Sequence, residues 1–114
     1  MKIYKYLKGI LKKYRTYSGN DIDYENAKII LKNVQDAVLI DVRSPQEYKE
    51  EHLENSINIP LYDITKNIDN VIQNKETTII VCCQSGNRSK KAIEILSKRG
   101  YKNLYNIVGG IDNI

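Results

Sequence analysis

The residues with the clearest chemical potential lie together between positions 83 and 88. Cys83 supplies a thiol and Arg88 a fixed positive charge. Four residues separate them, namely Gln84, Ser85, Gly86 and Asn87. Because Gly, Ser and Asn tolerate unusual backbone angles, this segment can form a tight loop that turns backbone N–H groups inward to bind an anion. A cysteine sulfur at such a site is stabilised as a thiolate, the nucleophilic form of the group.

A second cysteine, Cys82, directly precedes Cys83. Side chains alternate along a strand, so we expect Cys82 to point away from Cys83 and to have a structural role. A disulfide between neighbours would close almost no loop and would constrain little. The cysteine content therefore favours a reducing compartment, which we expect to be the cytoplasm, and a chemical use of one thiol.

The elements that must position this loop follow from hydrophobic patterning. Short apolar and β-branched runs predict strands over residues 37–40, 56–60, 78–82 and 104–108. Helical spacing predicts helices over residues 24–32, 45–51 and 89–99, and one or two more within 61–74. Asp23 is expected to cap the first of these, and Ser44 with Glu47 to form a capping box at the second. The alternation of strands and helices predicts a small α/β domain with a mainly parallel sheet.

The N-terminal segment differs in charge from the rest of the chain. Residues 1–15 contain six basic and no acidic residues, whereas the remainder has 12 basic and 14 acidic residues, a net charge of −2. Residues 3–14 have the spacing of a basic amphipathic helix, so we divide the chain into this helix and turn (1–20) and a domain (21–114). The helix could dock on the domain or on a partner subunit, or attach weakly to an anionic membrane surface or an acidic partner through residues 1–15.

Several classes of protein are disfavoured by the composition. No apolar run approaches the ~18 residues of a transmembrane helix, and the N-terminus does not have the pattern of a secretory signal. Nucleic-acid binding has little support, because the basic residues are concentrated on one short helix and the domain is slightly acidic.

Four sequence blocks resemble those of the rhodanese family and occur in the family's order. Cys83–Ser89 is similar to the active-site signature Cys-x-x-Gly-x-Arg-Ser, and Leu39–Tyr48 resembles the first conserved block. His52–Pro60 resembles a third block and Val108–Ile111 a fourth. The resemblance covers about residues 22–114 and implies a central, mainly parallel, five-stranded sheet flanked by helices.

The resemblance also implies sulfurtransferase chemistry without a cofactor or metal. Cys83 would take the sulfane sulfur of a small donor such as thiosulfate, polysulfide or a low-molecular-weight persulfide, and pass it to an acceptor, which could be a protein. The segment from Gln84 to Arg88 would bind the substrate and stabilise the persulfide, with Arg88 helping to hold an anionic donor.

Other functions remain open at this stage. A rhodanese fold can serve as a non-catalytic binding or regulatory module, although the usual mark of such modules is loss of the cysteine. Phosphatase-type members have one more residue between Cys and Arg, which makes phosphatase or arsenate chemistry a minor alternative. A thiol-redox function would need a resolving thiol, and Cys82 is the only candidate.

Two residues outside the loop, Asp41 and Arg43, could support it. Asp41 and Arg43 follow a predicted strand and could reach the same face; Asp41 could organise the loop or only stabilise the fold. We expect Arg43 to stabilise the fold by bridging to Glu47. His52 is the only histidine, and we expect a structural role, because a thiol that is already ionised needs no general base.

The chain departs from the family pattern at several positions away from the loop. Glu51 and Asn55-Ser56 replace small family residues, and Ile114 stands where many members have Trp. We expect the N-terminal helix to cover core surface that the missing Trp would leave open.

Overall fold

The structure is a computed structural model that describes residues 20–114. The predicted amphipathic helix over residues 3–14 lies outside the described residues. Within residues 20–114, no helix is long and apolar enough to cross a membrane.

The centre of the fold is a five-stranded sheet in which every neighbouring pair of strands is parallel. Its order is β1-β5-β4-β2-β3. The strands are β1 (Asp21–Ile22), β2 (Val38–Asp41), β3 (Ile57–Asn58), β4 (Thr78–Cys82) and β5 (Asn103–Ile107). The five-stranded parallel sheet confirms the prediction, and the four predicted strands are present within one or two residues at each end.

Within residues 20–114, four helices and two short 3₁₀ turns accompany the strands. They are α2 (Tyr24–Asn33), α3 (Pro45–Glu50), η1 (Leu61–Asp63), α4 (Ile64–Val71), α5 (Asn87–Lys98) and η2 (Ile111–Asn113). The predicted caps are confirmed: Asp23 accepts from the backbone N–H of Asn26, and Ser44 and Glu47 form a complete capping box. The region 61–74 divides into η1 and α4.

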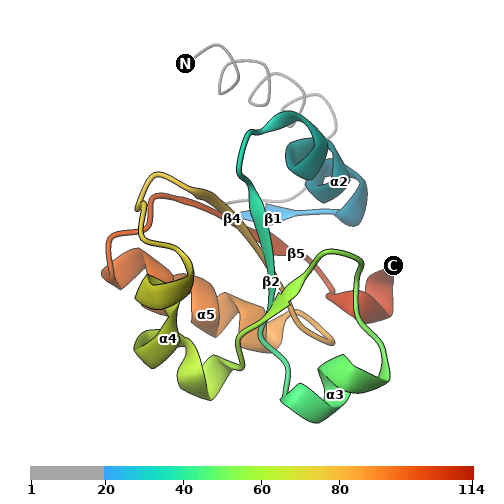
Figure 1. Cartoon of the computed structure of the whole chain (residues 1–114). Coiled ribbons are helices and arrows are strands. Elements are labelled where there is room, and N and C mark those ends of the chain that lie inside the picture. Colours follow the sequence, from blue (N-terminus) through green and yellow to red (C-terminus); the bar gives the residue numbers. More distant parts are fainter. Residues whose placement is uncertain (1–19) are drawn as a thin grey trace.

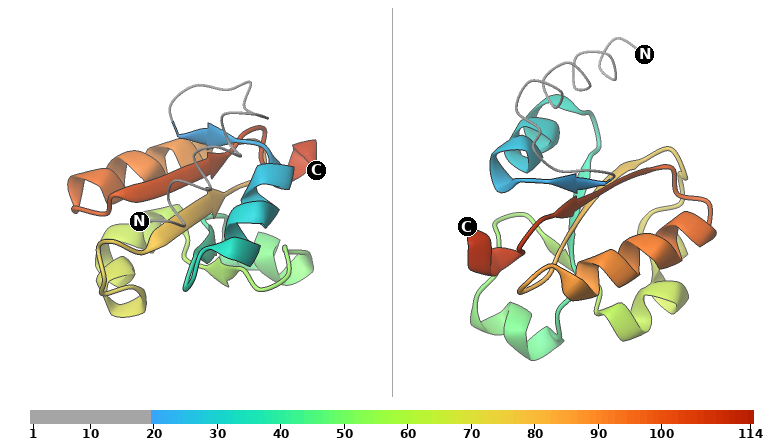
Figure 2. Two further views of the ribbon diagram at one scale, coloured as in Figure 1. Left: turned by 90° about the horizontal axis from the view of Figure 1, so that it is seen from above. Right: turned by 180° about the vertical axis from the view of Figure 1, so that it is seen from behind.

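Helices cover both faces of the sheet, as Figures 1 and 2 show. Alternate residues of β4 enter separate hydrophobic clusters. Ile79 and Val81 pack in the cluster that includes the inner faces of α4 and α5, whereas Ile80 packs with residues of α2. Burial on both faces explains why the strand is apolar throughout rather than alternating.

The carboxyl ends of β2 and β4 meet at one end of the sheet, where α3 and the C-terminal turn also lie (Figure 1). The backbone N–H of Val42 donates to Cys82 O at 3.0 Å, and that of Ile111 donates to Cys83 O at 2.9 Å. This end of a parallel sheet is where ligand sites are generally found, and it brings the loop after β4 together with the segment after β2.

Candidate active site

The sulfur of Cys83 lies at the N-terminus of α5 and accepts hydrogen bonds from its backbone. The N–H of Gly86 is 3.0 Å from Sγ and the N–H of Ser89 is 3.4 Å from it. Gly86 is the N-cap residue with φ +101°, a conformation that glycine adopts at low cost. The inward N–H groups and the positive end of the helix dipole together form a site suited to an anion.

The helix begins at Asn87, two residues earlier than predicted. The prediction placed Asn87 and Arg88 in the loop because Gly, Ser and Asn dominate the segment, whereas the apolar periodicity starts only later. Arg88 therefore projects from the first turn of a helix, which fixes its direction more firmly than a loop would. Ser85 and Asn87 are exposed and Gln84 is half-buried.

Two buried polar residues near the loop, Ser89 and Asn106, were not among the predicted site residues. Ser89 Oγ lies 3.4 Å from Sγ and 3.0 Å from Gly86 O, and it is also within hydrogen-bond distance of Asn106 Oδ1. Asn106 Nδ2 in turn donates to Asp21 Oδ1 at 2.9 Å. Ser89 stands in the same motif as Cys83, so its position was a usable signal, whereas nothing in the local sequence marked Asn106.

The two cysteines enter opposite faces of the sheet, as predicted. Cys83 packs in the α4 and α5 cluster and Cys82 in the α2 cluster, and both are buried. Burial raises the pKa of the Cys82 thiol, and the charge of Asp41 raises it further. Cys82 therefore has the surroundings of a small apolar core residue.

Arg88 forms a two-pronged ion pair with Glu47 of α3. Its Nη1 and Nη2 atoms lie 2.7 and 2.9 Å from the two carboxylate oxygens. The hydrogen bonds from Arg88 are the main cause that lowers the pKa of Glu47 to about 2, and the pair also raises the pKa of Arg88. Glu47 thus caps α3 and is also the counter-ion of Arg88.

Asp41 and Arg43 form a second, buried pair. Arg43 donates to both carboxylate oxygens of Asp41, and the side chains are 0% and 5% exposed for Asp41 and Arg43 respectively. These bonds raise the pKa of Arg43. The predicted bridge from Arg43 to Glu47 was wrong. Arg43 pairs with Asp41 because side chains two residues apart lie on the same side of an extended chain, and Glu47 contacts Arg88 instead.

The buried pair is connected to the loop through Gln84. Arg43 Nη1 donates to Gln84 Oε1 at 3.2 Å, and Gln84 Nε2 donates to Asp112 Oδ1 at 2.6 Å. Asp41 is therefore connected to the loop through Arg43, and its role in organising the loop stays a prediction. Gln84 uses both ends of its amide to hold the loop between β2 and the C-terminal turn.

The C-terminal turn packs directly against the loop. The N–H groups of Ile111 and Asp112 donate to the carbonyl oxygens of Cys83 and Gln84, each at 2.9 Å. Gly110 permits this approach, because a Cβ atom there would lie 2.5 Å from both of those oxygens. The Gly109-Gly110 pair of the fourth sequence block thus supports the position of Cys83.

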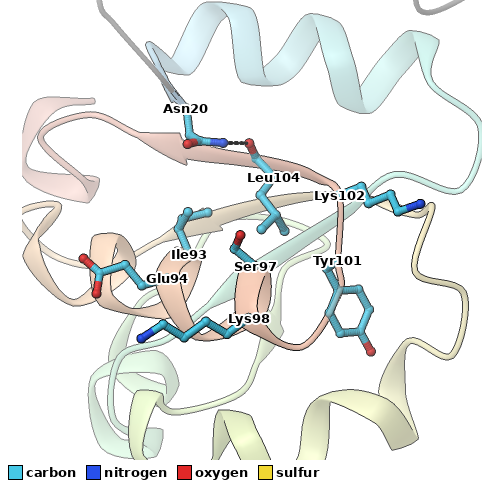
Figure 3. A pocket seen from close by; sticks show the side chains of 8 residues that line it. All are labelled: Asn20, Ile93, Glu94, Ser97, Lys98, Tyr101, Lys102 and Leu104. Carbon is cyan, nitrogen blue, oxygen red and sulfur yellow. Dashed lines mark hydrogen bonds between the residues drawn. The ribbon is translucent and has the colours of Figure 1, made fainter.

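Other possible sites are less well supported by chemistry. His52 stacks on Tyr48 and its Nδ1 lies 2.7 Å from Tyr48 O, so its described contacts are with α3. No group of three metal-ligating side chains occurs within residues 20–114. A cavity of about 370 Å³ lies beside α5 and β5, away from the sulfur, where Asn20 donates to Leu104 O at 2.7 Å (Figure 3).

The chain is similar in sequence to two curated proteins that are named as sulfurtransferases. The thiosulfate sulfurtransferase PspE of Escherichia coli is 41% identical over 75 residues, which are 66% of this chain and 71% of that protein. The adenylyltransferase and sulfurtransferase uba4 of Ogataea parapolymorpha is 44% identical over 73 residues, but these are only 18% of its length. The likeness to that longer protein is thus confined to one part of it.

Solved structures show the same fold. A rhodanese-like domain protein from Staphylococcus aureus superposes with a TM-score of 0.74 at 27% identity, covering 83% of this chain and 90% of that one. A rhodanese with anions from E. coli gives a TM-score of 0.63 at 38% identity, covering 68% and 91%. The family profile of the rhodanese-like domain matches residues 25–114. The chain therefore belongs to the rhodanese-like domain family.

Proposed function

We propose that this protein is a sulfurtransferase that carries a sulfane sulfur as a persulfide on Cys83. The observation that carries the proposal is the position of Sγ, which accepts N–H groups of Gly86 and Ser89 at the start of α5. The same N–H groups can stabilise the negative charge of a persulfide, because its outer sulfur is only one bond from Sγ.

The reaction proceeds in two displacements. The Cys83 thiolate attacks the sulfane sulfur of the donor, forming a Cys83 S–S bond while the bond within the donor breaks. With thiosulfate the leaving group is sulfite, which keeps the bonding electron pair, and the enzyme holds a persulfide anion. An acceptor nucleophile then attacks the outer sulfur and regenerates the Cys83 thiolate.

The burial of Cys83 supports a donor with a terminal sulfur. Cys83 is only 1% exposed, so a bulky electrophile has little access to Sγ. The sulfane sulfur of thiosulfate, of polysulfide or of a low-molecular-weight persulfide is a terminal atom that can enter the recess alone. A small thiol, cyanide or a protein thiol can act as the acceptor once the outer sulfur lies nearer the surface.

A redox function fits the surroundings less well. A resolving thiol must reach the oxidised sulfur of Cys83, yet Cys82 is buried on the opposite face of the sheet. Burial also raises the pKa of Cys82, which disfavours the reactive thiolate form.

Intact mass spectrometry tests the proposal. The protein is exposed briefly to thiosulfate, and separately to polysulfide, and its mass is measured before and after addition of cyanide. We expect a gain of one sulfur atom that cyanide removes as thiocyanate. Cys83→Ser is expected to gain nothing, since it lacks the nucleophile.

Cys82→Ser is the matched control, because it removes a thiol from the neighbouring position without touching the loop. It is expected to gain the same sulfur atom as the wild type. Failure of the wild type to gain sulfur from either donor would contradict the proposal, and loss of the gain in Cys82→Ser would point to redox chemistry instead.

A further inference from the structure

Arg43 contacts the active-site loop and Arg88 extends from it, and each guanidinium group is already paired with a carboxylate. Arg43 is 4% exposed, and its N–H groups donate to Asp41, to Gln84 and to the carbonyl oxygen of Glu51. Arg88 is more accessible, with 38% of its side chain exposed, but it directs two N–H donors at Glu47. Arg88 is also near enough to interact electrostatically with Cys83.

We propose that Glu47 is a specificity-determining residue that selects against dianionic sulfur donors by occupying Arg88. This inference rests on the proposed sulfurtransferase function and deepens it: among the donors that fit the recess, low-molecular-weight persulfides are favoured over thiosulfate. The persulfide donor carries at most one charge at its reactive end, whereas thiosulfate carries two.

The charges around the loop give the physical reason. The carboxylates of Glu47 and Asp112 hold Arg88 and Gln84 respectively, so two negative charges are fixed on side chains of the segment that would bind a thiosulfate dianion. To bind through Arg88, it must displace Glu47 from a two-pronged pair, the strongest geometry for this kind of bond. A carboxylate near the loop therefore acts mainly by weakening the binding of thiosulfate, the more negative donor, rather than by strengthening the binding of a persulfide.

The leaving groups make the same distinction. When Cys83 attacks thiosulfate, the S–S bond breaks and sulfite leaves as a dianion, so an unoccupied cation would assist the step. When Cys83 attacks the outer sulfur of R–S–SH, the bond to the inner sulfur breaks and a thiolate, R–S⁻, leaves with a single charge. Pairing Arg88 with Glu47 therefore penalises the first reaction more than the second.

Glu47→Gln is a clean test because it removes the charge and retains the cap. Glu47 accepts the N–H of Ser44 at 3.0 Å, and glutamine serves equally in a capping box. Glu50→Gln is the matched control, since it removes one negative charge from the same helix at an exposed position. The double variant Glu47→Gln/Arg88→Gln removes the guanidinium that the single variant would release.

The experiment measures the second-order rate constant for sulfur loading of Cys83, using intact mass at quenched times. The two donors are thiosulfate and 2-hydroxyethyl persulfide. Glu47→Gln is expected to raise the thiosulfate constant at least about tenfold and to change the persulfide constant less than about threefold. Glu50→Gln is expected to leave both within about twofold, and the double variant is expected to lose the thiosulfate gain.

The outcomes separate this inference from the function on which it rests. If wild-type protein is loaded by neither donor, the sulfurtransferase proposal fails and the specificity proposal fails with it. If wild-type protein is loaded and Glu47→Gln leaves unchanged or lowers the thiosulfate constant, only the specificity role of Glu47 is overturned. A gain that survives in the double variant would also overturn it, because the benefit would then not come from Arg88.

Discussion

Gly110 sets how closely the C-terminal turn approaches the sulfur-bearing loop. A Cβ atom there would lie 2.5 Å from the carbonyl oxygens of Cys83 and Gln84, and its φ of +63° is itself unfavourable for alanine. Gly110→Ala is therefore expected to lower the free energy of unfolding by about 2 kcal/mol or more. It should also slow sulfur loading at least about tenfold, because the loop must shift to relieve the overlap. Urea denaturation and the loading assay measure the two effects.

Gly100→Ala is the matched control for backbone conformation. Gly100 also has a positive φ, +96°, but the nearest atom to an added Cβ is Lys75 Cδ at 4.0 Å. This variant is expected to cost only the backbone term, about 1 kcal/mol, and to load sulfur at the wild-type rate. Equal losses of stability and loading in the two variants would contradict the steric role assigned to Gly110.

At the scale of single residues, the sequence predicted the nucleophile better than its partners. Cys83, Gly86 and Arg88 stand within six consecutive positions, so their types and spacing could be interpreted together. Glu47 was correctly predicted as a cap, but its contact with Arg88 spans 41 positions. No local pattern encodes such a contact, because it depends on how α3 and α5 are placed by the sheet.

The pair between Glu47 and Arg88 connects two elements, α3 and the start of α5, and its contribution should depend on pH. The pKa of Glu47 is lowered to about 2 in the folded protein, below its ordinary value of 4.5. A carboxylate of this kind stabilises the fold above its unfolded pKa, and the stabilisation is lost as pH falls toward the folded pKa. The wild type is expected to be more stable than Glu47→Gln at pH 7, with a difference that shrinks between about pH 4.5 and 2. Urea denaturation at several pH values provides the measurement.

Arg88→Gln offers an independent check of the same pair. Since either substitution removes the interaction, the advantage of the wild type over Arg88→Gln should shrink over the same pH interval. A difference that stayed constant down to pH 2 for both variants would show that the pair does not couple α3 to α5. Comparing differences between variants cancels the titration of groups that all the proteins share.

Elements with strong periodicity were predicted with small errors, and the misses have physical causes. β1 was not identified because two residues, Asp21 and Ile22, are too few to show an alternating pattern. It exists because its backbone pairs with β5, a contact between distant parts of the chain. The start of α5 was predicted late because its first two residues are polar: Asn87 is exposed and Arg88 pairs with Glu47.

At the scale of the whole molecule, residues 20–114 account for every described contact around Cys83. The sheet, the four helices and the C-terminal turn supply the hydrogen bonds to the loop and to its paired side chains. One open feature beside Asn20 is the cavity of Figure 3, which is also lined by Ile93, Tyr101 and Leu104 among others. Asn20, the first described residue, lies at this edge.

Deleting residues 1–17 tests whether the N-terminal segment stabilises the domain. The apolar residues at helical spacing within 3–14 are expected to pack on the domain, and burying even one such side chain is worth about 1.5–3 kcal/mol. We therefore expect the deletion to lower the Tm by at least about 4 °C, measured by circular dichroism at matched protein concentrations. Sulfur loading of Cys83 at 25 °C should stay at the wild-type rate, because residues 20–114 themselves supply the described hydrogen bonds that hold the loop. An unchanged Tm would contradict this docking and would favour attachment of the segment to an anionic surface or to another molecule.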